Sequence, residues 1–269
     1  MNPLPYIAVG DLNMYYESIG EGEPLVLIMG FAANLDWWPP EFIEPIARKF
    51  RVITFDNRGS GRTEGPVSRY TIPRAADDTA ALMDAMKIPR AHVFGLSMGG
   101  MIAQELVLRH PQWVNRLILG ATAPAPANPL RMLSHRPLKV FWRYFTDPKL
   151  RAMSIEASFI FDQDYLLRTP GIYFRFMKEA RRIPPTFKTR FFHSLGIIRF
   201  NATRRLKTIK ARTLIIAGTR DSMVPYRNSP FMTKKIIGSR LVTLDETGHA
   251  FVKERLDSAQ TIRDFLEES

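Results

Sequence analysis

The stretch Gly95-Leu96-Ser97-Met98-Gly99-Gly100 decides the fold. It ends a short apolar run over residues 92–96 and begins a helical pattern over residues 98–110, so the motif G-x-S-x-G joins an expected strand to an expected helix. Glycines two positions before and after Ser97 leave space for a sharp turn that lifts the serine hydroxyl to the helix N-terminus. Backbone N–H groups and the helix dipole favour negative charge there. The placement indicates that Ser97 is a nucleophile rather than only a helix cap.

On both sides of this turn, expected strands alternate with expected helices. Apolar runs without polar alternation are typical of strands buried on both faces of a parallel sheet, and they cover residues 25–29, 51–56, 92–96, 116–120, 213–217 and 240–244. Helical patterns lie between or after them, over residues 41–49, 74–86, 98–110, 230–237 and 252–267. Residues 4–18, with a turn near Gly10-Asp11, predict an antiparallel hairpin at one edge. The alternation predicts an α/β fold, with a mostly parallel sheet and helices on both faces.

One segment, residues 129–210, breaks the alternation. Its patterns are helical, for example over residues 173–182, and Pro124, Pro126 and Pro129 mark its start. It contains 18 lysine and arginine residues against 5 acidic residues, whereas the rest of the chain has 20 basic and 21 acidic residues. The net charge of +12 therefore belongs to this segment, which is also rich in aromatic residues. We expect a helical insertion near residues 124–210 in an otherwise nearly neutral scaffold.

Composition excludes several classes of protein. A chain of 269 residues with 45% hydrophobic content is long enough to bury one sizeable core, which excludes global disorder. Because the chain has no cysteine, a disulfide scaffold, a thiolate zinc site and a cysteine nucleophile are excluded. The sequence also lacks a G-x-G-x-x-G dinucleotide loop, a P-loop and a histidine–carboxylate set with metal-ligand spacing. We therefore expect no cofactor and no metal.

The location of the protein is predicted from two further features of the sequence. The N-terminus lacks a basic region followed by an apolar core, so it does not resemble a signal peptide. No run approaches the roughly 18 uncharged apolar residues that a membrane helix needs. We expect a cytoplasmic protein.

A serine hydroxyl needs a base to take its proton, and the chain has five histidines. His249 is the best candidate, because it follows the last apolar run, at the expected carboxyl end of a strand, with a glycine before it. His92 begins an expected strand and His110 ends an expected helix, and both positions suit structural roles. His135 and His193 lie in the insertion, where a solvated or core histidine is the preferred interpretation over one that lines a pocket.

The base in turn needs an acid that fixes its tautomer and stabilises the imidazolium. Asp221 follows the penultimate apolar run, again at a carboxyl end, where open α/β sheets collect their reactive residues. Asp245 and Glu246 are nearer to His249 in sequence but belong to its own loop. We interpret these two as surface charges and Asp221 as the acid.

These motifs together resemble the α/β-hydrolase superfamily, specifically the small esterases, lactonases, cofactor-free haloperoxidases and carbon–carbon bond hydrolases that have a helical cap. The chain order Ser97, Asp221, His249 matches that superfamily. The resemblance also rests on Gly30-Phe31, on Asp56-Asn57-Arg58-Gly59-Ser60-Gly61-Arg62, on Gly218-Thr219-Arg220-Asp221 with Val224-Pro225, and on Gly248-His249. It covers residues 20–123 and 211–267, and it implies a core over residues 1–123 and 211–269 with a cap over residues 124–210.

The resemblance also implies an oxyanion hole. Its donors would be the backbone N–H of Met98, which follows the nucleophile, and that of Phe31, in the loop after the first buried strand. This chain has Met29-Gly30 where the family usually has His-Gly, so we expect the loop to be anchored differently while the backbone donor remains. The turn 56–59 is interpreted as holding neighbouring loops through its charges, without a catalytic role. Serine at position 97 also excludes the aspartate nucleophile of related dehalogenases and epoxide hydrolases.

The composition of the insertion leaves several interpretations open. Its aromatic residues suggest an apolar pocket for the substrate, although packing of the cap helices accounts for most of them. Its positive charge is interpreted first as solvated helix surface and next as docking on an anionic membrane surface. Attraction of an anionic substrate comes third, and nucleic-acid binding is least favoured because no recognised motif accompanies the charge.

We expect a serine hydrolase of the carboxylesterase kind, which cleaves carboxylic esters with an apolar, short- to medium-chain acyl group through an acyl-enzyme. Its expected partner is a small-molecule ester, and the oligomeric state is left open. Alternatives on the same three residues are a lactonase, a carbon–carbon bond hydrolase and a perhydrolase. An alternative of another class is a hydrolase-fold binding protein or receptor with little turnover.

Overall fold

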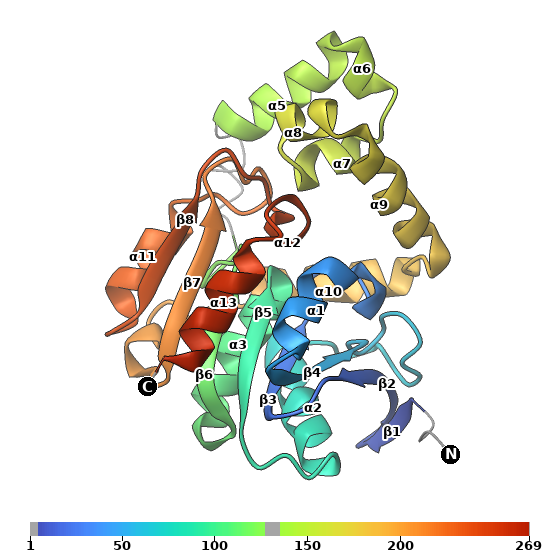
Figure 1. The fold of residues 1–269 in the computed structure, drawn as a ribbon. Helices are drawn as coiled ribbons and strands as arrows, with labels where there is room; N and C mark the ends of the chain where they lie inside the picture. The colour runs from blue at the N-terminus through green and yellow to red at the C-terminus, as the bar shows by residue number, and fades with distance from the viewer. Residues whose placement is uncertain (1–4, 127–134, 269) are drawn as a thin grey trace.

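The computed structural model describes residues 5–126 and 135–268, without the side chains of residues 135–137, and its centre is an eight-stranded sheet (Figure 1). The strand order is β1-β2-β4-β3-β5-β6-β7-β8, with β1 and β2 antiparallel, β2 and β4 antiparallel, and every other pair parallel. The strands are β1 (Tyr6–Val9), β2 (Leu12–Ile19), β3 (Glu23–Ile28), β4 (Phe50–Phe55), β5 (Ala91–Leu96), β6 (Val114–Gly120), β7 (Arg212–Gly218) and β8 (Arg240–Leu244). The predicted mostly parallel sheet and its edge hairpin are confirmed.

Helices cover both faces of the sheet. Along β3, Val26 and Ile28 belong to one apolar core, whereas Leu25 and Leu27 belong to the other. The first core includes side chains of α2 (Ile72–Ala85), α3 (Met98–Arg109) and α11 (Asn228–Lys235), and the second includes those of α1 (Pro40–Ala47), α12 (Phe251–Glu254) and α13 (Ser258–Glu267). Burial on both faces explains why the strands are continuous apolar runs in the sequence.

Local sequence determines where these helices begin and end. α2 begins after Thr71, whose hydroxyl accepts the N–H of Arg74, and Pro73 in its first turn has no N–H to leave unpaired. The single helix expected over residues 252–267 is in fact two helices, because Arg255 has a non-helical backbone with φ −128° and ψ 73°. The short helix α12 therefore follows His249 as a separate element.

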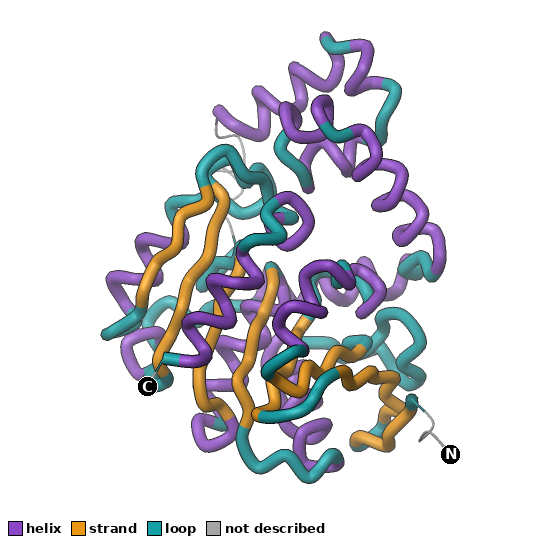
Figure 2. The backbone as a smooth tube through the Cα atoms, viewed as in Figure 1, coloured by secondary structure: helices purple, strands orange, loops and turns teal. Residues whose placement is uncertain are grey.

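The insertion between β6 and β7 is helical, as expected. Its described helices are α5 (His135–Thr146), α6 (Pro148–Arg151), α7 (Ile155–Ile160), α8 (Gln163–Arg168), α9 (Pro170–Arg182) and α10 (Phe187–Arg199). Figures 1 and 2 show α5 to α9 beyond the carboxyl ends of the strands, whereas α10 lies against the core. The predicted start of the cap falls partly on residues 127–134, outside the described residues, and the division at residues 124 and 210 stays a prediction.

Two parts of the insertion contact the core. In α10, the Thr189 hydroxyl donates to the Gly59 carbonyl at 2.5 Å, and the His193 ring lies 4.3 Å from the ring of Tyr70. Around α7 to α9, a smaller apolar cluster includes Phe161 and Ala250, the residue after His249. The insertion is therefore attached both to the segment between β4 and α2 and to the loop that carries His249.

One side of α5 is apolar and exposed. Leu138, Phe141, Trp142 and Phe145 recur at helical spacing, and Trp142 is 67% exposed. Within residues 5–126 and 135–268, no helix combines the length and the apolar character that crossing a membrane requires.

Candidate active site

Ser97 lies in the turn between β5 and α3 and has a strained backbone. Its φ is +58° and its ψ is −120°, a conformation that non-glycine residues seldom adopt. A Cβ on Gly95 would lie 2.2 Å from the Gly99 carbonyl oxygen, and a Cβ on Gly99 would lie 2.0 Å from the Ile28 carbonyl oxygen. Glycine at both positions therefore lets the turn close against β3. This is the tight strand-to-helix turn that the spacing of the motif predicts.

Ser97, His249 and Asp221 form a hydrogen-bonded series. The Oγ of Ser97 is 2.9 Å from Nε2 of His249, and Nδ1 of His249 is 2.8 Å from Oδ2 of Asp221. Because an ionised carboxylate only accepts hydrogen bonds, Nδ1 carries the proton and Nε2 accepts the serine O–H. The structure thus brings together three residues that the sequence places at the ends of three different strands, and the imidazole can take the serine proton.

The Asp221 carboxylate is also fixed from its other side. Its Oδ1 accepts the N–H groups of Met223 and Val224, each at 2.8 Å, and the residue is only 3% exposed. The second oxygen, Oδ2, is left for His249, which is 9% exposed. Both partners are therefore largely shielded from water.

The loop after β3 brings Gly30 close to Ser97. A Cβ on Gly30 would lie 3.1 Å from the Cβ of Ser97 and 3.6 Å from its Oγ, so the loop contacts the serine directly. Met98 is the first residue of α3, where backbone N–H groups have no acceptor within the helix. Met98 directly follows Ser97, and Phe31 lines the same cavity as Ser97, but the use of their N–H groups as an oxyanion hole stays a prediction.

His193, in α10, anchors this loop. Its Nδ1 accepts the N–H of Ala32 at 3.2 Å, and its Nε2 donates to the carbonyl of Arg58 at 2.9 Å. The residue is fully buried, and burial lowers the pKa of the imidazole to about 4, so the ring is neutral at pH 7. The expected role as a core histidine is confirmed. The sequence did not predict that His193 contacts the loop after β3, in which Met29 stands where the family usually has histidine. Its partner there, Ala32, is 161 positions away in sequence.

The charged residues of the turn 56–59 hold neighbouring loops, as expected. Asp56 accepts the N–H of Leu35 through Oδ1 and that of Arg62 through Oδ2, each at 2.7 Å. The buried Arg58 guanidinium pairs with Asp11 at 2.6 Å and with Asp78 at 2.7 Å. These contacts fasten the β3 loop, the edge hairpin and α2 to one another.

His92 and His110 lie outside the series and have other partners. His92 pairs with Glu23 at 2.8 Å, and burial lowers the pKa of its imidazole. His110 pairs with Asp77 at 2.7 Å. These contacts fit the expected structural roles, whereas the side chain of His135 lies outside the described part of the chain.

A cavity of about 410 Å³ opens onto Ser97 and His249. Its lining is mainly apolar and comes from the β3 loop, α7, α9 and α12, including Phe31, Trp37, Phe159, Ile160 and Phe176. Lys253 also lies in the wall, but its ammonium pairs with Glu179 at 2.5 Å, and burial lowers its pKa. The insertion therefore supplies much of the surface that a substrate would contact.

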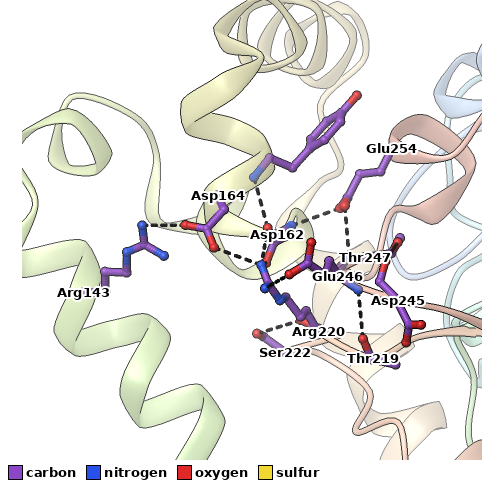
Figure 3. Close-up of polar contacts among 12 residues, drawn as sticks. Arg143, Asp162, Asp164, Thr219, Arg220, Ser222, Asp245, Glu246, Thr247 and Glu254 are labelled. Carbon is purple, nitrogen blue, oxygen red and sulfur yellow. Dashed lines mark hydrogen bonds and ion pairs between the residues drawn. The ribbon is translucent and has the colours of Figure 1, made fainter.

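A cluster of charged residues joins the insertion to the loops after β7 and β8 (Figure 3). Arg220 pairs with Asp164 at 2.9 Å, with Asp162 at 3.3 Å and with the exposed Glu246. Arg143 of α5 approaches Asp164 from the other side, at 2.7 Å. Glu246 thus has the expected surface position and a partner that bridges to the insertion.

Glu254, the last residue of α12, was not recognised from the sequence. Its Oε2 accepts the N–H of Gly248 and its Oε1 accepts the N–H of Asp162, each at 3.0 Å (Figure 3). Burial raises the pKa of the carboxyl to about 7. The sequence carries no signal for this, because a glutamate in a helical pattern is ordinarily a solvated charge.

No three His, Asp or Glu side chains of the described ranges are grouped so that they could hold a metal ion. The expectation that the protein uses neither metal nor cofactor stays a prediction.

Comparison with known proteins shows the family to which the chain belongs. The family described as alpha/beta hydrolase fold matches residues 23–256. A protein of Azorhizobium caulinodans named "Putative carbamate hydrolase RutD" is 28% identical over 251 residues, which cover 92% of each chain. The enol-lactonase from Burkholderia xenovorans LB400 has a TM-score of 0.84 at 28% identity, over 98% of this chain and 100% of that one. Est816, described as an N-acyl homoserine lactone degrading enzyme, has a TM-score of 0.80 at 27% identity, over 97% and 100%. The chain is a hydrolase, and it belongs to the α/β-hydrolase fold family.

Proposed function

We propose that the protein is a serine hydrolase that cleaves carboxylic esters with an apolar acyl group of short to medium length. The observation that carries the proposal is the hydrogen-bonded series of Ser97, His249 and Asp221 at the edge of an apolar cavity. A serine hydroxyl becomes a strong nucleophile when a neighbouring base takes its proton, and a buried carboxylate keeps that base in the required tautomer.

In the first half of the reaction, the ester acylates the enzyme. The Oγ of Ser97 bonds to the carbonyl carbon while its proton passes to Nε2 of His249, and Asp221 stabilises the imidazolium. The carbonyl oxygen takes up the electron pair, and the N–H groups of Phe31 and Met98 hold this oxyanion, each contributing about 3 kcal/mol. When the intermediate collapses, the ester C–O bond breaks and the alcohol leaves with the proton from Nε2.

In the second half, water releases the acyl group. Nε2 of His249 takes a proton from water as the water oxygen bonds to the acyl carbon. The bond to Ser97 then breaks, and Oγ takes the proton back from the imidazolium. Ester and water are consumed, an alcohol and a carboxylic acid are formed, and the enzyme is regenerated.

The cavity supports a small apolar acyl group. Its volume of about 410 Å³ lies near the lower end of the range of roughly 300–1,000 Å³ that is common for ligand pockets. An ionised group on the substrate would lose its hydration against the apolar walls. Both cations of the wall have acidic partners: Lys253 pairs with Glu179 at 2.5 Å, and Arg190 pairs with Glu156 at 3.9 Å. An apolar acyl group is therefore favoured over an anionic one.

A second candidate is lactone hydrolysis, which the names of two structural relatives favour. The enol-lactonase and Est816, which degrades an N-acyl homoserine lactone, both match nearly the whole chain. A lactone is a cyclic ester, so the same attack by Ser97 opens the ring and leaves the alcohol and the acyl group in one product. The same three residues serve both reactions, and the choice between them depends on the shape of the cavity.

The test is hydrolysis of p-nitrophenyl esters from acetate to palmitate, together with titration of the acid released from lactones. We compare the wild type with Ser97→Ala and with Ser68→Ala, in which the serine removed is exposed on a surface turn. We expect the highest rates on short to medium esters, a loss of at least about 10⁴-fold in kcat for Ser97→Ala, and wild-type rates for Ser68→Ala. Activity that survives Ser97→Ala contradicts the mechanism. A wild type inactive on both substrate classes favours carbon–carbon bond hydrolysis, perhydrolysis or a binding function.

A further inference from the structure

His249 is held on both sides by hydrogen bonds of its sequence neighbours. The N–H of Gly248 donates to Oε2 of Glu254 at 3.0 Å. The N–H of Ala250 donates to the carbonyl of Ile160, in the insertion, at 3.0 Å. Because the imidazole is attached between these two backbone groups, its direction toward Ser97 depends on them.

The carboxylate of Glu254 reaches the insertion as well. Its second oxygen, Oε1, accepts the N–H of Asp162 at 3.0 Å, so one side chain joins the His249 loop to a segment near the α7–α8 junction. A Cβ on Gly248 would lie 2.4 Å from the nitrogen of Asp162 and 2.6 Å from Oε1 of Glu254. Gly248, Asp162 and Glu254 are therefore in direct contact, with no space for a side chain at position 248.

The same segment is bonded to the loop that carries Asp221. The carboxylate of Asp162 accepts the N–H of Tyr165 at 3.0 Å and lies 3.3 Å from Nη1 of Arg220 (Figure 3). Arg220 directly precedes Asp221, and its own N–H donates to the carbonyl of Thr247 at 2.9 Å. Residues 160–162, the segment of the insertion at the junction of α7 and α8, thus contact both the loop of His249 and the loop of Asp221.

We propose that Glu254 is a positioning residue, which keeps His249 in line with Ser97 by fastening the His249 loop to segment 160–162 of the insertion. The inference rests on the proposed function, and it adds that turnover depends on how the insertion is seated. Two N–H groups that face one carboxyl group need two acceptor oxygens, and an ionised carboxylate supplies both. A glutamine at position 254 supplies one acceptor and turns its NH₂ toward the other N–H, so one bond is lost.

The experiment compares Glu254→Gln with Glu41→Gln. Glu41 of α1 pairs with Arg175 of α9 at 3.8 Å, so it also joins the core to the insertion, and this ion pair involves neither the His249 loop nor segment 160–162. Three quantities are measured: kcat and KM on a p-nitrophenyl ester, the rate at which a fluorophosphonate modifies Ser97, and the downfield ¹H NMR resonance of the Nδ1 proton of His249.

In Glu254→Gln we expect kcat and the fluorophosphonate rate to fall about 10- to 100-fold, the size of effect that a misplacement of about 1 Å produces. KM stays within about twofold, because Glu254 is not among the residues that line the cavity, and the Nδ1 resonance shifts or broadens. Glu41→Gln stays close to the wild type in all three quantities.

The proposal is overturned if Glu254→Gln keeps the wild-type kcat and an unchanged Nδ1 resonance. It is also overturned if kcat falls equally in Glu41→Gln, because that would mean a general loosening of the insertion. If Glu254→Gln does not fold, Glu254→Asp replaces it: the shorter carboxylate cannot reach both N–H groups, so the same loss of kcat supports the proposal and wild-type kcat refutes it. A wild type that neither hydrolyses esters nor reacts with the fluorophosphonate contradicts the proposed function instead, and the NMR comparison still tests the positioning.

Discussion

The hydrogen bonds around Asp221 predict in detail what Asp221→Asn does. Its Oδ1 accepts two N–H groups, from Met223 and Val224, each at 2.8 Å. In the asparagine variant the amide oxygen has to take this place, because the opposite orientation sets an NH₂ group against two N–H donors. The NH₂ group then faces Nδ1 of His249, which lies 2.8 Å from Oδ2 in the wild type.

This orientation changes the tautomer of His249. Nδ1 has to accept a hydrogen bond from the NH₂ group, so the imidazole proton moves to Nε2, where it faces Oγ of Ser97. A histidine in this state cannot take the serine proton. The corresponding substitution in a serine protease lowers kcat about 10⁴-fold, which is about 5.5 kcal/mol in the activation barrier. We expect a loss of this size here, with little change in the free energy of unfolding, because the side chain keeps its volume and its hydrogen bonds to Met223 and Val224.

The assay is kcat on p-nitrophenyl butyrate between pH 6 and 10, with urea unfolding of the same preparations. Asp245→Asn is the control, because Asp245 is exposed in the loop that leads to His249, and we expect it to match the wild type. A loss of less than about tenfold in Asp221→Asn would mean that His249 keeps its tautomer without the carboxylate, and it would refute the reasoning.

Other parts of the structure make further predictions. Gly99→Ala should lower the free energy of unfolding by more than about 4 kcal/mol or prevent folding, because the added Cβ would lie 2.0 Å from the Ile28 carbonyl oxygen; an unchanged urea midpoint contradicts this. Burial lowers the pKa of His193 from its ordinary value of about 6.5 to about 4 in the folded protein. Between pH 6.5 and pH 4 the unfolded chain therefore binds a proton that the folded protein does not. The free energy of unfolding should fall by up to about 3 kcal/mol as the pH decreases through this range. His193→Gln should flatten this pH dependence in urea unfolding, and parallel curves for variant and wild type count against the assignment. The exposed aromatic side of α5 and the basic charge of the insertion predict weak co-sedimentation with phosphatidylserine vesicles at low salt. We expect added salt to abolish this binding and Trp142→Ala to reduce it. No binding at low ionic strength rejects the membrane interpretation.

The residues of the hydrogen-bonded series could be predicted because parallel strands end at one edge of a sheet. Ser97, Asp221 and His249 each follow an apolar run, so their convergence required only that β5, β7 and β8 lie in the same sheet. The strand-to-helix turn could be predicted for a similar reason, because the glycines that it needs are close to Ser97 in sequence.

His193 and Glu254 could not be predicted in this way, because their roles depend on partners far away in sequence. His193 bonds to Ala32, 161 positions earlier, and Glu254 bonds to Asp162, 92 positions earlier. The pattern of the insertion predicted helices, since helical periodicity is local. It did not indicate which of their side chains contact the loop of His249, because periodicity identifies a buried face of a helix but not the residues that cover it.

The glycines packed around Ser97 also limit how such a site can diversify. Gly95 and Gly99 meet backbone atoms at distances that no side chain tolerates, so the turn that carries Ser97 cannot be reshaped by small substitutions. The opposite wall consists of side chains of α7 and α9, such as Phe159 and Phe176, which can be exchanged without moving the serine. New substrate preferences are therefore accessible through side chains of the insertion, while the reacting atoms keep their places. Directed evolution of this chain should concentrate its libraries on that wall.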